Sequence, residues 1–380
     1  MKKNKSFVLI FTLTILSLST IITYQLIKLV YVGTHFDQTM VDRENAEMLA
    51  LGGINLAMSQ LVIKKPDSAS TSAKATEDKK AMTGKEEEKK EFENFLKRVL
   101  PNINRWQEFE LQEDVDGIEG TVKICISCEN GKININETFD FKKNEFKNEY
   151  KNFLDTIKFK SGEQTSGKFL KKLTEFLKKR GKKLDDLSEL QTGALPEIKQ
   201  FFYEPPIRTE KKRDAKPNQS LAIQDIFTIW SKTDKIEALF LSDSLCKILQ
   251  LRQPKAYDSE TFKDKFKDVI KNFDPNKNEN TEEYWKILKP IYEPKTKIRI
   301  EDKKIFSTRF EPTVYSVISF GKVGKVEQRL LAIIEKNPDY DNQESEKSAD
   351  KQKKEDDKKG SASNTVKNKK PFKILRLYWI

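Results

Sequence analysis

Residues 1–30 of the chain read MKKNKSFVLIFTLTILSLSTIITYQLIKLV, and this stretch decides how the rest is organised. No charged side chain interrupts the run from Phe7 to Ile27. As a helix rising 1.5 Å per residue, this run would reach about 31 Å, roughly one hydrocarbon core. The apolar region of a secretion signal is typically about 7–15 residues long. We therefore predict a membrane-spanning helix over residues 7–28 that stays in the protein.

The residues on either side of this run set its orientation and its length. Lys2, Lys3 and Lys5 on the short side favour an amino terminus kept in the cytoplasm. Beyond the run, apolar residues recur at helical spacing up to residue 63, with Gly52 and Gly53 as a weak point or bend. The stripe consists of Met40, Ala46, Ala50, Leu51, Ile54, Met58 and Leu61. We predict one helix over residues 7–63, half in lipid and half amphipathic. The alternative is an ordinary membrane anchor followed by an unrelated helix.

Composition excludes several classes of function. The 380 residues include 71 Lys and Arg against 59 Asp and Glu, a net charge of +12. The lysines are mixed with acids and form no basic stripe with interleaved aromatics, so no nucleic-acid partner is expected. The single histidine, His35, argues against His-based metal sites and most His-assisted nucleophilic mechanisms. No phosphate-binding or nucleophile motif occurs, so we expect no enzyme and no cofactor.

The pattern along the chain predicts an α+β fold with an antiparallel sheet. Two charged stretches poor in apolar residues, 64–91 and 338–371, are predicted to be a low-complexity insertion and a disordered loop. Residues 92–140 would form the first part of an α/β domain. Residues 293–337 and 372–380 would supply its closing strands. Residues 141–292 between them have helical patterns and would form an inserted helical domain.

Local patterns give finer expectations. Residues 120–128 and 132–136 are predicted strands joined by a turn at Glu129-Asn130-Gly131, since Asn-Gly adopts positive φ cheaply. Residues 146–157, 168–179, 220–230, 238–251, 262–273 and 281–292 are predicted helices. Residues 296–300, 313–323, 326–337 and 371–380 are predicted strands. The last of these should pair with the main sheet despite the preceding loop.

Two candidate chemistries are weak. Cys125 and Cys128 form a CxxC in a strand-like run, which leaves structural thiols, a local disulfide needing a bend, or a redox or metal role open. The acidic pairs are Asp114 with Asp116 and Asp185 with Asp186. Neither extends into a full calcium loop. Weak calcium binding therefore stays open beside the simpler reading of solvated turns.

Three stretches together resemble one family, the minor pseudopilin K of type II secretion, and its type IV pilus relatives. KSFVLI at residues 5–10 resembles a prepilin signal, with a basic leader over residues 1–6 and cleavage between Ser6 and Phe7, where the family has glycine before the cut. RENAEMLALGGINLAMSQL at residues 43–61 resembles the helix exit of the family. ISCENGKININ resembles its most specific segment, with matches at Glu129, Gly131, Lys132, Asn134 and Asn136.

The resemblance implies an assembly role. Most pilin-like subunits carry a glutamate at the fifth mature position, which pairs with a neighbour's amino terminus. Here that position is the uncharged Phe11, as in the K-type subunit, whose family role is the tip of a short pseudopilus. The implied partners are minor pseudopilins of the I and J types, the major pseudopilin and the prepilin peptidase. The implied location is the inner membrane, with one span and a periplasmic main domain.

Other interpretations remain open from the sequence. The chain could be a minor pilin of a type IV pilus, which uses the same physics in another machine. It could also be an unrelated single-pass anchored binding protein. An enzyme using Asp114 or Asp116 is the remotest alternative, because no constellation of catalytic groups supports it.

Overall fold

The computed structural model describes residues 4–62, 94–100, 102–155, 166–194, 221–249, 251, 292, 304–307, 312–337 and 370–380. Side chains are described from residue 10 onward in the first helix and from residue 169 in α6. The predicted segments 64–91, 262–273, 281–291 and 296–300 lie outside these residues, as do most of 338–371 and the start of the leader. The fold is mixed α and β, with a long amino-terminal helix and an antiparallel sheet.

The elements follow one another in this order: α1 (Asn4–Leu61), β1 (Trp106–Leu111), α3 (Glu113–Asp116), β2 (Gly120–Cys128), η2 (Glu129–Gly131), β3 (Ile133–Asn134), α4 (Ile135–Thr138), β4 (Phe139–Asp140), β5 (Glu145–Phe146), α5 (Asn148–Asp155), α6 (Ser166–Arg180), α7 (Ser188–Gly193), α8 (Ile223–Ile226), β6 (Phe227–Thr228), η3 (Ala238–Phe240), α9 (Asp243–Ile248), β7 (Val314–Val323), β8 (Val326–Lys336) and β9 (Phe372–Trp379). Residues 94–99 are also helical.

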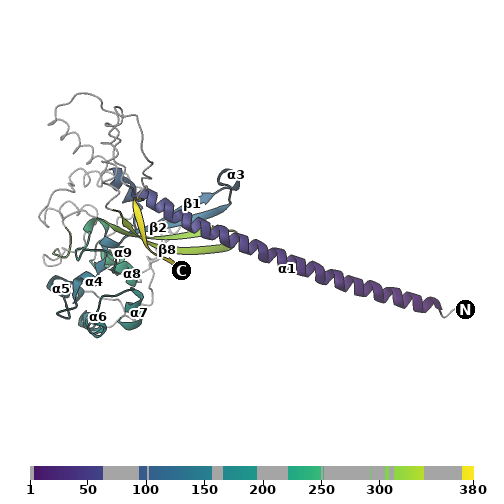
Figure 1. Ribbon diagram of the computed structural model, residues 1–380, viewed down its shortest axis with the longest axis horizontal. Helices are drawn as coiled ribbons and strands as arrows, with labels where there is room; N and C mark the ends of the chain where they lie inside the picture. The colour runs from purple at the N-terminus through teal and green to yellow at the C-terminus, as the bar shows by residue number, and fades with distance from the viewer. Residues whose placement is uncertain are drawn as a thin grey trace, which may run out of the picture.

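The main sheet has five strands in the order β1-β2-β7-β8-β9, and every neighbouring pair is antiparallel. β7 and β8 form a hairpin whose turn begins at Gly324 with a φ of +55°, a value that glycine adopts at little cost. β9 adds to the outside of β8, as the sequence predicts. Helices α4 to α9 lie beyond one end of this sheet, and α1 projects from the other end, where α3 also lies (Figure 1).

α1 is one uninterrupted helix, and its second half packs on the sheet, mainly on β7 with β2 and β8 on either side. The buried stripe is Ala46, Ala50, Gly53, Ile54, Ala57 and Leu61. The approach is close, because a Cβ at Gly321 of β7 would lie 2.1 Å from the Ala46 carbonyl oxygen. Two expectations were therefore wrong. Leu51 is 42% exposed instead of buried. The Gly52-Gly53 pair is helical without a break, with Gly53 against the sheet and Gly52 facing solvent.

Two local predictions are corrected by the structure. The Asn130-Gly131 pair forms a 3-10 turn without positive φ, and β3 pairs in parallel with β6 instead of folding back on β2. The predicted helices over 220–230 and 238–251 are broken into short pieces, α8 followed by β6, and η3 followed by α9. These segments are buried on nearly all sides, and their side chains join the core that also contains the α1 stripe and the described parts of α5, α6 and α7.

Candidate functional site

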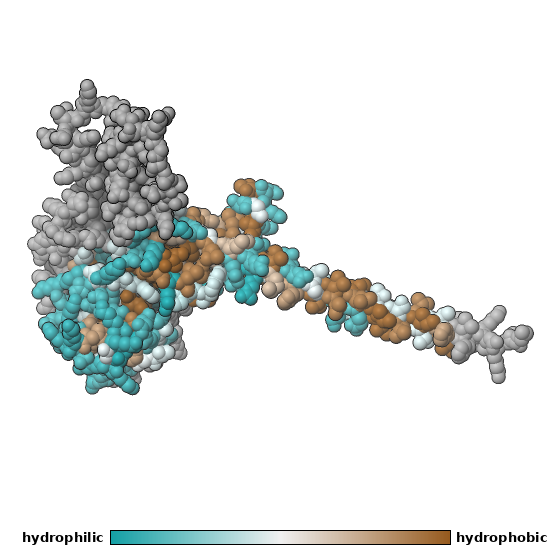
Figure 2. Space-filling view, in the orientation of Figure 1, coloured by the Kyte–Doolittle hydropathy of each residue, from teal (hydrophilic) through white to brown (hydrophobic). Residues whose placement is uncertain are grey.

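The amino-terminal half of α1 presents apolar side chains to its surroundings. Residues 10–32 are exposed throughout, and Figure 2 shows this part of the helix as a largely apolar rod away from the head. Thr14, Thr20 and Thr23 each donate a hydroxyl hydrogen bond to the carbonyl four residues earlier, at 2.8–2.9 Å. These bonds satisfy the hydroxyl donors within the helix, as a hydrocarbon environment demands. α1 is long and apolar enough to cross a membrane, a property that amino-terminal signal sequences share.

The predicted assembly residues lie in this exposed half. Ser6 and Phe7 are in the first turns of α1, where the structure describes the backbone alone. Phe11 is 60% exposed on the surface of the helix. The first acidic residue of the sequence is Asp37, well beyond the apolar run. An unpaired carboxylate in lipid is costly, so this segment is suited to remain in a bilayer without a charged partner.

The segment from Glu129 to Asn136 begins where β2 ends and is buried throughout. The side chains of Glu129 and Lys132 are 1% and 3% exposed, and Lys132 Nζ lies 2.5 Å from Glu129 Oε1. Thr228 Oγ1 donates to Glu129 Oε2 at 2.5 Å, and Ser316 Oγ lies 3.5 Å from Lys132 Nζ. A buried ion pair needs such further hydrogen bonds to offset desolvation. The pair therefore joins η2 to both β6 and β7.

Asn130 and Gly131 connect the same turn to two other segments. Asn130 Oδ1 accepts hydrogen bonds from the backbone N–H groups of Thr313 and Val314 at 3.1 and 3.0 Å. At Gly131 a Cβ would lie 1.8 Å from the Phe240 carbonyl oxygen, so only glycine fits there. The Asn-Gly sequence is thus explained by packing and hydrogen bonding, since neither residue has positive φ.

The two asparagines that follow bind loops on opposite sides. Asn134 Oδ1 accepts from the N–H groups of Asn136 and Glu137 at 2.9 and 3.3 Å, and its Nδ2 donates to Ser231 Oγ at 3.0 Å. Asn136 makes two hydrogen bonds with the backbone of Leu184, 2.9 Å to its carbonyl and 2.7 Å from its N–H. The side-chain amide of Asn136 therefore pairs with this loop much as a neighbouring strand would.

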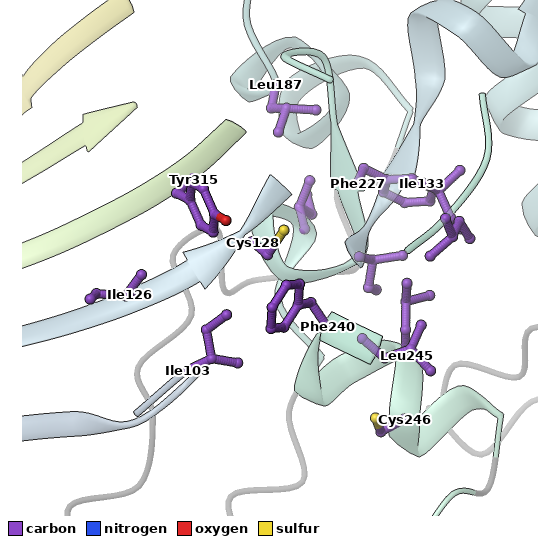
Figure 3. Packing of buried hydrophobic residues seen from close by; sticks show 14 of the residues in the cluster. Ile103, Ile126, Cys128, Ile133, Leu187, Phe227, Phe240, Leu245, Cys246 and Tyr315 are labelled. Carbon is purple, nitrogen blue, oxygen red and sulfur yellow. The ribbon is translucent and has the colours of Figure 1, made fainter. Parts of the chain in front are cut away.

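These contacts bring the five motif residues and Asn130 into one buried polar cluster, here called the joint: Glu129, Asn130, Gly131, Lys132, Asn134 and Asn136. Figure 3 shows the end of β2 at this place, with Cys128 near Tyr315 of β7 and Phe240 of η3. None of the joint's charged groups faces solvent. The arrangement is suited to fixing loops on the end of the sheet, and it offers no exposed nucleophile.

A pair of buried acidic residues, Asp225 and Asp243, lies beside the joint. Burial, and then the neighbouring Asp243, raise the pKa of Asp225 to about 7, and the Lys132 charge opposes this rise. Asp225 Oδ2 accepts a hydrogen bond from the Ser244 N–H at 2.7 Å. Asp225 lies within the helix predicted over 220–230, and its burial was not identified from the sequence. The available signal was a polar pair, Gln224 and Asp225, between Ile223 and Ile226.

The cysteines are buried thiols. Cys125, Cys128 and Cys246 are free, so the disulfide alternative is not formed. Cys125 and Cys128 lie on the one continuous strand β2, and burial raises the pKa of both thiols. A raised pKa disfavours the thiolate that redox chemistry and metal binding use. Packing therefore explains this CxxC.

The acidic pairs Asp114 with Asp116 and Asp185 with Asp186 lie on different elements, and the contacts of the second pair are with a basic and a hydroxyl side chain. Asp114 and Asp116 lie on the exposed helix α3. Asp185 Oδ2 lies 2.9 Å from Arg180, and Asp186 accepts a hydrogen bond from the Tyr378 hydroxyl at 3.0 Å. Within the described ranges, no three His, Cys, Asp or Glu side chains gather in a way that could hold a metal ion.

Comparison with known proteins adds no relative. No protein-family model matches the chain, and no curated protein matches it.

Proposed function

We propose that this chain is a minor pseudopilin of the K type in a type II secretion system, and that it forms the tip of the periplasmic pseudopilus. In this role it is a non-enzymatic assembly component with a pilin-like head and an inserted helical domain. The observation that carries the proposal is α1, whose first half is an exposed apolar rod and whose second half packs on a five-stranded antiparallel sheet. Such a helix can span a membrane before assembly and pack against other subunits in a filament afterwards.

The tip position rests on charge within α1. A subunit inside a pilin-like stack needs a carboxylate in its apolar segment to receive the amino terminus of the next subunit. This chain has none before Asp37, and Phe11 occupies the expected position. Without that carboxylate, no further subunit can bind on top of this one. The chain also avoids the cost of burying an unpaired carboxylate in the membrane before assembly.

The proposal includes orientation and partners. Lys2, Lys3 and Lys5 hold the amino terminus in the cytoplasm, so the head lies in the periplasm of an inner-membrane protein. Its partners are the I-type and J-type minor pseudopilins and the major pseudopilin. The prepilin peptidase removes residues 1–6 on the cytoplasmic side.

Mass spectrometry of the mature amino terminus tests the proposal. In cells with an active prepilin peptidase, the chain should begin at Phe7, and in cells lacking that peptidase it should begin at Met1. A Ser6→Gly variant serves as the matched control, since it restores the family residue and should be cleaved at least as completely. A wild-type chain that still begins at Met1 while Ser6→Gly is cleaved would contradict processing of the natural sequence.

Two further measurements separate the alternatives. Co-purification with type IV pilus proteins instead of pseudopilins would indicate that the chain is a minor pilin of a type IV pilus. Replacing residues 7–28 with an unrelated membrane span should abolish function if this segment assembles. Retained function would favour a simple anchored binding protein.

A further inference from the structure

We propose that the free edge of β9 binds an extended segment of another protein in which apolar and acidic side chains alternate. β9 is one of the two outer strands of the five-stranded sheet, and no other described strand pairs with its outer side. An unpaired edge offers backbone donors and acceptors to an added strand. The inference goes beyond the proposed function: the binding edge rests on the sheet, and only the exclusion of a second copy rests on the proposed membrane-spanning helix.

At two apolar residues of β9, Leu377 and Trp379, the backbone N–H and C=O groups are directed away from β8. Ile380 N donates to the Arg329 carbonyl at 3.1 Å, so this residue pair is hydrogen-bonded across the two strands. Hydrogen-bonded pairs alternate in an antiparallel ladder. The N–H and C=O groups of Leu377 and Trp379 therefore point away from β8. Their side chains are 41% and 50% exposed.

These two side chains lie on the helix-covered side of the sheet. Leu377 and Trp379 are opposite Ala332 and Leu330 of β8, which belong to the core beneath α1. Opposite residues of paired strands share a face. α1 packs on β7, β8 and β2, and so leaves this part of β9 uncovered. An added strand with apolar residues facing this side would extend the core by one row.

The other side of β9 is basic. Lys373 and Arg376 are exposed, and Arg376 is opposite Ile333, which faces away from α1. The Arg376 guanidinium lies 6.0 Å from the centre of the Tyr378 ring. Residues 370–380 contain three basic and no acidic side chains. Two acids from other elements lie on this face: Glu335 of β8 is opposite Lys373 and pairs with Lys232, and Asp186 lies near Arg376 and accepts a hydrogen bond from Tyr378. The three cations Lys232, Lys373 and Arg376 therefore exceed these two acids by one, and acidic side chains of an added strand would lie beside the exposed Lys373 and Arg376.

Charge and geometry disfavour a second copy as the occupant. Two β9 edges paired with each other would bring their cations together. β1, the opposite edge, has the right pattern, with exposed Glu108 and Glu110 alternating with Phe109 and Leu111. However, a sheet twists by about 20–25° per strand, so five strands would rotate the second copy's α1 by roughly 100°. Two membrane helices at that angle could not share a bilayer, so a segment without its own anchored sheet fits better.

Peptide binding to the full chain in lipid nanodiscs tests the proposal. The probe is a fluorescent seven-residue peptide alternating valine and glutamate, and its control alternates valine and lysine. Anisotropy should show binding of the acidic peptide, at least about tenfold tighter than the basic one. Hydrogen exchange should slow at the amides of Leu377 and Trp379.

Variants locate the site by charge. The double variant Lys373→Glu with Arg376→Glu should weaken the acidic peptide by about tenfold and strengthen the basic one. Lys322→Glu changes an exposed cation of the interior strand β7 and should leave both affinities unchanged. If the double variant fails to fold, the comparison of the two peptides on the natural chain still decides. The proposal would be overturned by equal affinity for both peptides, or by slowed hydrogen exchange at the amides of β1 instead of β9. It would also be overturned if the chain forms an oligomer with itself and the peptide dissociates that oligomer.

Discussion

Two adjacent glycines in α1 should respond oppositely to the same substitution. A Cβ at Gly52 would meet nothing within 4 Å, because this residue faces solvent. A Cβ at Gly53 would lie 2.1 Å from Ser319 Oγ and 2.9 Å from methyl carbons of Ile124 and Val122. Alanine at either position gains the same helix propensity, so the difference between the two variants isolates the contact with the sheet.

The magnitudes follow from these distances. Gly52→Ala should raise the free energy of unfolding by up to about 1 kcal/mol, the propensity difference between glycine and alanine. Gly53→Ala gains the same amount and loses about 1–3 kcal/mol to overpacking, so it should be neutral to destabilising. Ser319 Oγ is buried with no hydrogen-bond partner in the described structure. Adding Ser319→Ala should therefore restore a large part of the loss at Gly53.

Thermal unfolding of the full chain in detergent, followed by near-UV circular dichroism, measures the effect. A gap of about 1–3 kcal/mol corresponds to roughly 2–12 °C in Tm for a head of this size. The double variant of Gly53 and Ser319 should recover about half of that gap. Equal Tm values for Gly52→Ala and Gly53→Ala would refute the close approach of α1 to β7. An unchanged gap in the double variant would refute the role of Ser319.

Two further predictions concern the buried charges. Lys132→Met should lower the free energy of unfolding by about 3–5 kcal/mol in urea titrations, because it leaves the Glu129 carboxylate buried without its ion-pair partner. Adding Glu129→Gln should reverse much of this loss. A Lys132→Met variant whose stability is within about 1 kcal/mol of the natural chain would contradict the pairing. Because burial raises the pKa of Asp225 to about 7 in the fold from the usual 3.8, the unfolded chain loses its proton first, and stability should fall as pH rises from about 4 to 7. Asp225→Asn should flatten that fall, and an unchanged pH profile would exclude Asp225 as its source.

The long elements could be predicted because their signals repeat. The uncharged run and its helical continuation indicate α1, and alternating or β-branched runs indicate β7, β8 and β9. The predicted stripe of α1 contains Ala46, Ala50, Ile54 and Leu61, which are buried, but it includes the exposed Leu51 and omits Gly53 and Ala57. Gly53 faces the sheet because the helix packs closely there, and the periodicity of apolar residues does not identify such a position.

The middle of the chain could not be predicted at the same level. Residues 223–228 are buried on all sides, so their apolar pattern has no period that would distinguish a helix from a strand. The joint could not be derived from residue types, because Glu129 and Lys132 are usually solvent-exposed residues. Only the resemblance of the GKININ segment singled out these residues. Their hydrogen-bond partner Leu184 lies in a loop, and Thr228 lies in the two-residue strand β6, where the sequence predicts a helix instead.

The packing of α1 on β7 has a consequence for biosynthesis. The ribosome makes α1 first, while β7 and β8, its main partners, come from the distant end of the chain. In the orientation proposed above, the stripe at Ala46 and Ala50 therefore stays uncovered while most of the polypeptide is made and moved across the membrane. Contacts this far apart in sequence form slowly, and an exposed apolar stripe invites wrong associations meanwhile. The chain should thus depend on a holding chaperone on the far side of the membrane until the final strands arrive.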